Sequence, residues 1–213
     1  MSIYAPGHIR ARLITSIGLG AMVALSASGH ALAATTYSDP VGDTFYHAPP
    51  YSDLVAASVD EDDGTYEFTM TVAGSIPAAP RLTPPGVVEL RWVVTLDLDP
   101  ATNPVGWPFA PGAPQSAQKG APEGFIAVAW DGNAFSATWY DRRPLLIGGD
   151  VQATTVPFEI GGDTVHVWLD GALIDDPASF GVGFVTAALP VLPGNGGYRR
   201  FLDYLQPFYN PWP

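Results

Sequence analysis

The clearest pattern along the chain is the strict alternation of polar and apolar residues over Thr65–Val72. Side chains of a β-strand point to its two faces in turn, so this alternation places all the large apolar residues of the segment on one face. The Asp62-Asp63-Gly64 sequence just before it is a turn signal, and Leu54–Val59 ahead of the turn has the composition of a partner strand. The pattern predicts a β-hairpin.

Six further segments have the composition and length of strands. They are Val88–Leu98, Phe125–Trp130, Ala134–Tyr140, Val151–Ile160, Thr164–Leu169 and Phe180–Ala187. Val88–Leu98 is almost continuously apolar, which is typical of a central strand covered on both faces. Asp131-Gly132-Asn133 between two of the segments predicts a second hairpin. Helix is limited to a short turn at Asp170–Asp175 or Pro177–Phe180.

The spacing of these segments predicts the fold class. Turn signals recur about every ten residues and no βαβ spacing occurs, which favours an all-β chain. We expect a single antiparallel β-sandwich of eight to ten strands, jelly-roll or immunoglobulin-like in its two sheets, with long Pro/Gly-rich loops. Residues 76–86, 100–124 and the tail 190–213 are rich in proline or glycine and are predicted to lie outside the strands.

The N-terminal residues have the build of a secretory signal. Arg10 and Arg12 precede an apolar stretch over Leu13–Leu25, and Ala31-Leu32-Ala33 offers small residues where signal peptidase needs them. A membrane anchor is the alternative, but the stretch is shorter than the ~20 residues of a spanning helix. We expect residues 1–33 to be a signal peptide and 34–213 the β-sandwich domain. The domain would be periplasmic or extracellular, without a membrane span after cleavage.

Composition narrows the possible partners. The residues after 33 hold seven bases and all 21 acids, a balance of −14. Such an acidic domain is a poor candidate for nucleic acid or anionic lipid, which need clustered Lys and Arg. The chain has no cysteine and therefore no disulfides. Its stability must come from a hydrophobic core, to which a bound metal ion could add. Neutral ligands, divalent cations and basic partners remain compatible with this charge.

Two groups of aspartates are candidate metal ligands. Asp39 and Asp43 flank a Pro-Val-Gly turn and Asp53 follows ten residues later, while Asp97 and Asp99 end the predicted central strand. Calcium prefers six to eight hard oxygen ligands from irregular loops, which predicts calcium rather than a softer metal. The alternatives are a solvated turn whose carboxylates cap backbone amides, and a hydrated strand end.

Several aromatic residues are candidates for ligand binding, because the apolar face of a sugar ring stacks on an indole or phenol. Trp107 and Phe109 lie in the long loop, and Trp139 and Tyr140 lie at the end of a predicted hairpin. The alternative is packing between the sheets, which we expect for Trp92, Trp130 and Trp168.

The residues that catalysis would need are sparse. Only His47 and His166 follow the predicted signal, and no nucleophile elbow, zinc-protease motif or phosphate-binding loop occurs. A glycosidase needs two carboxylates that converge, and Glu89, Asp97 and Glu123 are the candidates for such a pair. The adjacent arginines Arg142-Arg143 and Arg199-Arg200 either neutralise nearby acids or recognise an anion, and we favour the first.

The N-terminal half resembles a known family. Asp39-Pro-Val-Gly-Asp43, Asp53-Leu54, the hairpin into Tyr66-Glu-Phe-Thr-Met70, and Leu96-Asp-Leu-Asp99 are similar to secreted DOMON-like domains related to family 9 carbohydrate-binding modules. The resemblance covers about residues 37–110 and implies a β-sandwich stabilised by calcium, with sugar or haem bound in some members. The second acidic motif departs from the usual Asp-Thr-Asp, and Val105-Gly106 replaces the following Thr-Gly.

These observations combine into one expected function. We expect an exported, non-catalytic module that binds carbohydrate or a cell-surface partner and holds a structural calcium ion. The alternatives are a secreted glycosidase or esterase, and a purely structural or adhesive surface protein.

Overall fold

The computed structural model describes residues 34–44, 48–83, 86–99, 122–190, 200–205 and 210–212. These residues belong to one compact unit, Ala31–Pro213. The predicted signal peptide and most of the long loop over 100–124 lie outside the described residues, as do Trp107, Phe109 and His47. In the described part of the chain, no helix is long and apolar enough to cross a membrane.

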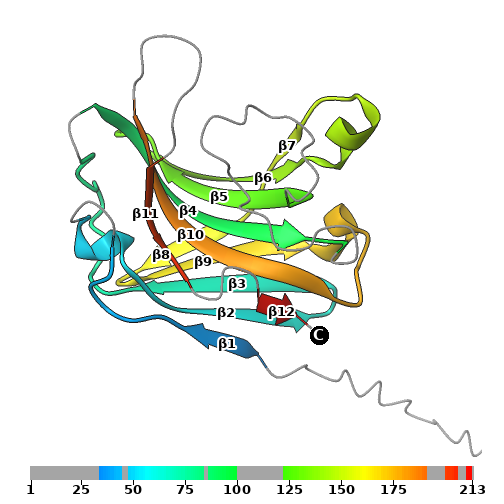
Figure 1. Ribbon diagram of the computed structural model, residues 1–213, viewed down its shortest axis with the longest axis horizontal. Coiled ribbons are helices and arrows are strands. Elements are labelled where there is room, and N and C mark those ends of the chain that lie inside the picture. The colour runs from blue at the N-terminus through cyan, green and yellow to red at the C-terminus, as the bar shows by residue number, and fades with distance from the viewer. Residues whose placement is uncertain are drawn as a thin grey trace, which may run out of the picture. The chain divides into compact units, whose positions relative to one another are not determined.

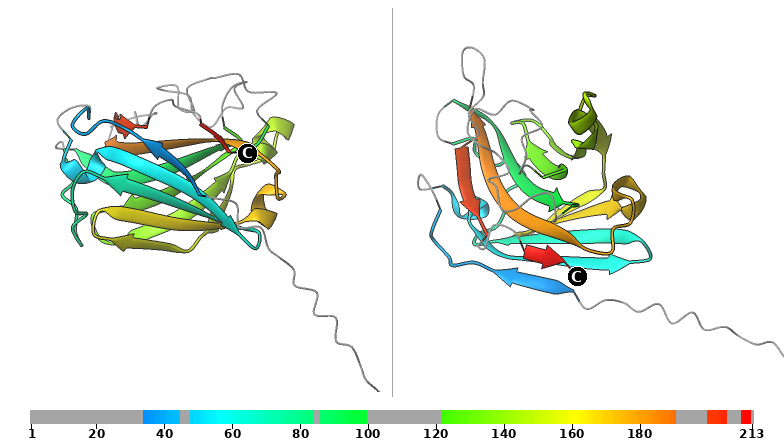
Figure 2. Two further views of the ribbon diagram at one scale, coloured as in Figure 1. Left: turned by 90° about the horizontal axis from the view of Figure 1, so that it is seen from below. Right: turned by 45° about the vertical axis from the view of Figure 1, so that its right-hand side comes forward.

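Two antiparallel sheets face each other, which confirms the predicted β-sandwich (Figures 1 and 2). The five-stranded sheet has the order β1-β2-β3-β9-β8, with β1 Thr35–Ser38, β2 Leu54–Asp62, β3 Thr65–Val72, β9 Thr164–Asp170 and β8 Phe158–Gly161. The other sheet has the order β11-β10-β4-β5-β6-β7, and β12 also pairs with β10. Its strands are β4 Val87–Asp97, β5 Gly124–Trp130, β6 Phe135–Asp141, β7 Gln152–Thr155, β10 Phe180–Pro190, β11 Arg200–Tyr204 and β12 Asn210–Trp212.

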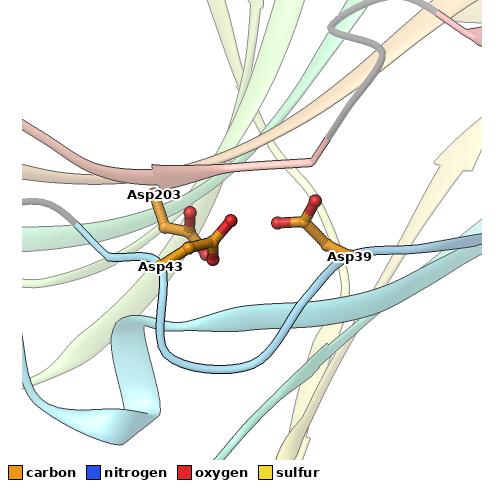
Figure 3. Close-up of side chains that lie close together, drawn as sticks. All are labelled: Asp39, Asp43 and Asp203. Carbon is orange, nitrogen blue, oxygen red and sulfur yellow. The ribbon is translucent and has the colours of Figure 1, made fainter.

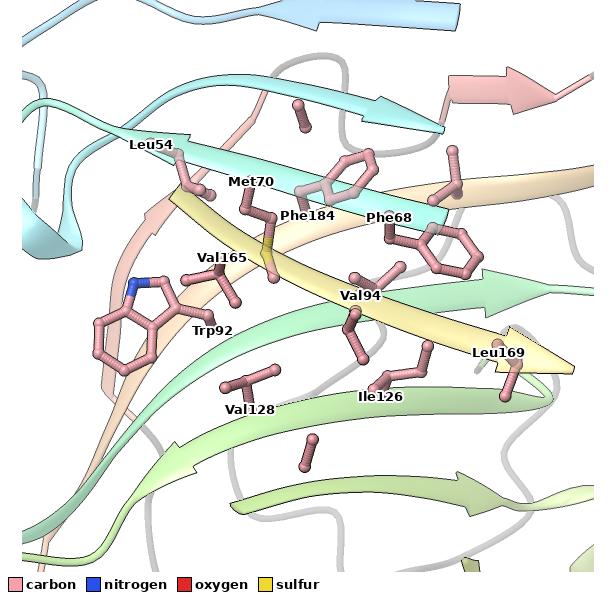
Figure 4. Close-up of a cluster of buried hydrophobic side chains, with 14 of the residues drawn as sticks. Leu54, Phe68, Met70, Trp92, Val94, Ile126, Val128, Val165, Leu169 and Phe184 are labelled. Carbon is pink, nitrogen blue, oxygen red and sulfur yellow. The ribbon is translucent and has the colours of Figure 1, made fainter. Parts of the chain in front are cut away.

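The core lies between the sheets and follows the alternation in the sequence (Figure 4). Every second residue of β3, from Tyr66 to Val72, is buried against β4, β5 and β10 of the other sheet. Trp92 and Trp130 lie in this core, as predicted, and the Trp92 indole donates a hydrogen bond to the Tyr51 carbonyl at 3.0 Å. Burying apolar surface from both sheets is the main stabilising term in such a fold.

The predicted strand Val151–Ile160 is wrong in one respect, because the structure divides it between the two sheets. β7 pairs with β6, and β8 pairs with β9. Pro157 sits between them and has no N–H to continue a ladder, so the chain leaves one sheet there and enters the other. This crossing closes one side of the sandwich.

The C-terminal tail, predicted to lie outside the strands, instead contributes β11 and β12 to the seven-stranded sheet. The prolines and glycines of this tail interrupt the alternation that would have predicted the two short strands, both of which pair with β10. The short helical turn expected after residue 170 is the 3₁₀ helix η4, Gly171–Ile174, whose first turn is capped by the Asp170 side chain. Two more 3₁₀ turns, η2 Pro50–Ser52 and η3 Arg143–Ile147, join strands.

Candidate functional site

Three carboxylates meet at the side of the sandwich opposite the β7–β8 crossing. Asp39 and Asp43 lie in the loop after β1, and Asp203 lies on β11 (Figure 3). Each offers one oxygen, and the three oxygens lie within 4.8 Å of one another. Strands β1 and β11 are edge strands of different sheets, so the cluster spans the gap between those sheets. Such a group can hold a metal ion.

The turn between Asp39 and Asp43 is fixed by backbone hydrogen bonds. The Asp39 amide donates to the Val55 carbonyl at 3.0 Å, which extends the pairing of β1 with β2 by one residue. Gly42 has a φ of +88°, a conformation that a residue with a Cβ rarely adopts. Its amide donates to Oδ2 of Asp53 at 2.8 Å. These bonds turn the loop back so that both aspartates face the same point.

Asp203 reaches the cluster because β11 carries a bulge. Asp203 pairs with Thr186 of β10 and Phe201 pairs with the next residue, Ala187. Leu202 is therefore the extra, bulged residue of β11. Asp203 then lies opposite Thr186 on the inner face and is 2% exposed. Its Oδ2 accepts a hydrogen bond from the Leu54 amide at 2.6 Å. This bond links the edge of the seven-stranded sheet to the first residue of β2 in the other sheet.

Asp53 adds a fourth carboxylate beside the cluster. It is 5% exposed, and its Oδ1 has no hydrogen-bond partner within the described residues. Its other oxygen, Oδ2, holds the Gly42 amide in the middle of the 39–43 turn, so Oδ1 lies next to that turn. A buried carboxylate oxygen without a donor is costly and calls for a cation or a water molecule nearby. Asp53 is not one of the three clustered residues, which makes it a supporting group for the site.

The second predicted metal group, Asp97 and Asp99, does not belong to a cluster of three metal-ligating side chains within the described residues. Asp97 is the last residue of β4, is 4% exposed and pairs with Gly181 of β10, while Asp99 is exposed. Within the described part of the chain, no set of three metal-ligating side chains includes either residue. The structure therefore separates Asp97 and Asp99 from Asp39 and Asp43.

The predicted role of Trp139 as an exposed sugar platform is wrong. Trp139 is 1% exposed and packs in the main core, with its ring lying over the backbone of Gly124. Alternation then places Tyr140 on the outer face of the seven-stranded sheet, where it is half-buried and stacks on Phe125 with ring centroids 4.7 Å apart. Trp139 therefore offers no exposed ring to a sugar, and one face of the Tyr140 ring is covered by Phe125.

Trp168, predicted to be a core residue, instead lies on the outer face of the five-stranded sheet. Val167 and Leu169 on either side of it are fully buried, so its own side chain points outward and is half-buried. Its ring is nearly parallel to that of His166, with centroids 6.1 Å apart. The alternation of Val165, Val167 and Leu169 was the sequence signal that placed Trp168 on the opposite face.

Polar side chains surround Trp168 on this face. Glu67 of β3 pairs directly across from Trp168, and Glu159 of β8 pairs across from His166. The Nδ1 atom of His166 lies 2.8 Å from Glu67 Oε1 and 3.2 Å from Thr69 Oγ1. His166 is therefore a partly exposed residue in a hydrogen-bonded group.

The first arginine pair serves the structure, as we favoured. Arg143 binds both oxygens of Asp141, at 2.9 and 2.8 Å, and also contacts Asp175 at 2.5 Å and the Leu173 carbonyl at 2.6 Å. The hydrogen bonds with Asp141 raise the pKa of the guanidinium above its usual range. This side chain joins the end of β6 to η4. Arg199 lies outside the described residues, and nothing is described of the Arg200 side chain.

Of the three acids named for a glycosidase pair, Glu89 lies far from Asp97. Glu89 lies at the beginning of β4 and pairs with Arg91, whereas Asp97 is the last residue of the same strand. Eight residues of strand separate them, roughly 27 Å, far more than the ~5–10 Å between glycosidase carboxylates. Glu123 lies near the Asp97 end, where its Oε2 accepts a hydrogen bond from the Leu98 amide at 2.8 Å.

No protein-family model and no curated protein sequence matches this chain. The similarity to DOMON-like domains thus remains a proposal. What the chain does is inferred from its two distinctive features, the carboxylate cluster and the outer face around Trp168.

Proposed function

We propose that this chain is an exported, non-catalytic binding module that takes a neutral saccharide on the outer face of its five-stranded sheet. The observation that carries the proposal is the position of Trp168, a half-buried indole on a polar sheet face. An indole in this setting can stack on the apolar face of a pyranose ring while neighbouring groups bind its hydroxyls.

The groups around Trp168 match the needs of a neutral sugar. Glu67 and Glu159 accept hydrogen bonds, and Thr69 and His166 can donate or accept them. The two carboxylates would repel an anionic sugar, so we expect uronic acids and sialylated glycans to be excluded. The DOMON-like resemblance of residues 37–110 and the secretory build of residues 1–33 agree with a module that meets glycans outside the cytoplasm.

Replacing Trp168 with alanine should abolish most of the saccharide binding. The loss of the stacking surface predicts affinity at least about tenfold weaker, corresponding to ~1.4 kcal/mol, for the neutral oligosaccharide that gives the strongest glycan-array signal. Titration calorimetry measures the change, and Trp168→Phe is the matched variant that keeps a smaller flat ring and should retain partial binding. Unchanged affinity in Trp168→Ala, with unchanged circular dichroism, would exclude this face as the site.

We also propose that the Asp39, Asp43 and Asp203 cluster holds a structural calcium ion. Carboxylate oxygens are hard ligands, and backbone carbonyls and water can complete the six to eight positions that calcium prefers. Magnesium demands a near-ideal octahedron and gives up its water reluctantly, whereas calcium accepts irregular sets of carboxylate and carbonyl oxygens from loops, which favours calcium here. Asp53 would orient the Gly42 turn as a supporting residue.

Calorimetric titration tests this ion directly. We expect one calcium site per chain and weaker binding of magnesium. Asp43→Asn, which keeps an oxygen but removes a charge, should weaken calcium binding at least about tenfold. Asp150→Asn is the matched control, because Asp150 is exposed and lies outside the cluster. Equal calcium binding by both variants would place the ion outside the Asp39, Asp43 and Asp203 cluster.

A further inference from the structure

The C-terminal strand β11 supplies Asp203, one of the three carboxylates of the proposed calcium site. It is a five-residue edge strand, and among the described strands it pairs with β10 alone. Its pairing is interrupted by the bulge at Leu202. Just beyond the strand, the Leu205 amide donates to the Phe184 carbonyl at 3.1 Å, and the Leu205 side chain is fully buried in the core. Pairing with β10, the buried Leu205 and the contacts of Asp203 therefore hold this segment together.

The described contacts of Asp203 cross from one sheet to the other. The Leu54 amide binds its Oδ2 at 2.6 Å, and the neighbouring Asp53 carries a buried Oδ1 that has no hydrogen-bond partner in the described ranges. Asp39 and Asp43 place two further carboxylates on the same side. Negative charges brought this close repel one another, and burial of Asp203 reduces the screening by water.

We propose that calcium binding docks β11, so that the order of residues 200–205 depends on the ion. This inference rests on the proposed calcium site, in which Asp203 is one of the three clustered carboxylates. With the ion bound, Asp203 is attracted to the same centre as Asp39 and Asp43, and β11 is fastened across the gap between the two sheets. Without the ion, the like charges oppose the docked position, and opening of the strand relieves the repulsion. Leu205 then leaves the core together with the strand.

A different role for Asp203 is protection of the sheet edge. Charged residues that point inward on edge strands discourage pairing with other chains. That role needs no metal and predicts the same strand order with and without calcium. The two roles therefore differ in one measurable quantity, the calcium dependence of local opening in β11.

Hydrogen exchange measured by mass spectrometry on the peptide that contains residues 200–205 tests the proposal. At free calcium 100 times the dissociation constant, exchange through openings that release the ion should be up to about 100-fold slower than in chelator. Amides of β3 in the centre of the five-stranded sheet provide the internal reference, since they open only with the whole domain.

Asp203→Asn separates charge from hydrogen bonding, because its amide oxygen can still accept from Leu54. We expect this variant to lose the calcium response of β11, and in chelator to exchange no faster than the wild-type protein, since the repulsion is gone. Asp150→Asn should behave as the wild type. If calorimetry detects calcium binding but β11 exchanges equally with and without the ion, the docking proposal is wrong and the calcium site stands. If no calcium binds, both are wrong.

Discussion

Gly124→Ala should destabilise the domain strongly, because a Cβ at this position has no room beside Trp139. An ideal Cβ at this position would lie 2.6 Å from Cζ2 and 2.7 Å from Cζ3 of Trp139. The indole is 1% exposed and cannot swing into solvent, so either the ring or the β5–β6 pairing has to shift. Overpacking of this kind costs about 1–3 kcal/mol, and we expect a value near the upper end. Urea unfolding followed by tryptophan fluorescence measures it.

Gly161→Ala is the control for this prediction. Gly161 ends β8 at the surface, and an ideal Cβ there would meet only Thr164 Oγ1, at 3.7 Å, an ordinary contact. The free energy of unfolding of the Gly161→Ala variant should differ from that of the wild type by at most about 1 kcal/mol, as expected for a glycine-to-alanine change in exposed backbone. If Gly124→Ala were as well tolerated as Gly161→Ala, the close packing of Trp139 on Gly124 would be wrong.

Removal of calcium should lower the melting temperature of the domain. An ion that binds only the folded state adds about 2.7 kcal/mol at 100 times its dissociation constant. For a domain of this length each kcal/mol corresponds to roughly 2–4 °C, so chelation should lower the melting temperature by roughly 5–11 °C. Differential scanning calorimetry with calcium and with chelator measures the change.

Asp43→Asn should remove most of this sensitivity, because the variant binds the ion weakly at the same concentration. In chelator it should melt no lower than the wild-type protein, since one of the repelling charges is gone. Asp150→Asn should show the full calcium response. A wild-type protein that melts at the same temperature in calcium and in chelator would contradict the proposed ion.

The strands were predictable because alternation is a local property. β3 runs over Thr65–Val72 as predicted, and the central strand predicted from its continuous hydrophobicity is β4, which lies between β10 and β5. The same reasoning could have placed Trp168 and Trp139 correctly. Trp139 is two residues from the buried Ala137 and so lies on the same strand face, whereas Trp168 is adjacent to the buried Val167 and so lies on the opposite face. The predictions for these two tryptophans ignored which face of the strand each one occupies. As a result Trp139 was predicted to be exposed and Trp168 to be buried, whereas in the structure Trp139 is buried and Trp168 lies half-buried on an outer face.

The carboxylate cluster was only half predictable. Asp39 and Asp43 are four residues apart and share one turn, so their sequence already indicated a common centre. Asp203 is remote from both in the chain and lies in a proline- and glycine-rich tail that gives no strand pattern. A bulge at Leu202 and pairing with β10 bring it to the turn. Asp97 and Asp99, like Asp39 and Asp43, are two aspartates close together in the sequence. In the described residues, however, no third metal-ligating side chain forms a cluster with them.

The sequence by itself determined that the chain forms antiparallel strands, which of their faces are apolar, and that Asp39 and Asp43 flank one turn. Those properties depend on neighbouring residues and on the two-residue period of a strand. Only the tertiary structure decided which edges of the two sheets meet, that Pro157 carries the chain between them, and that Asp203 joins Asp39 and Asp43. Those properties depend on which distant strands pair, and the free energy of that pairing comes from the assembled core rather than from any local segment.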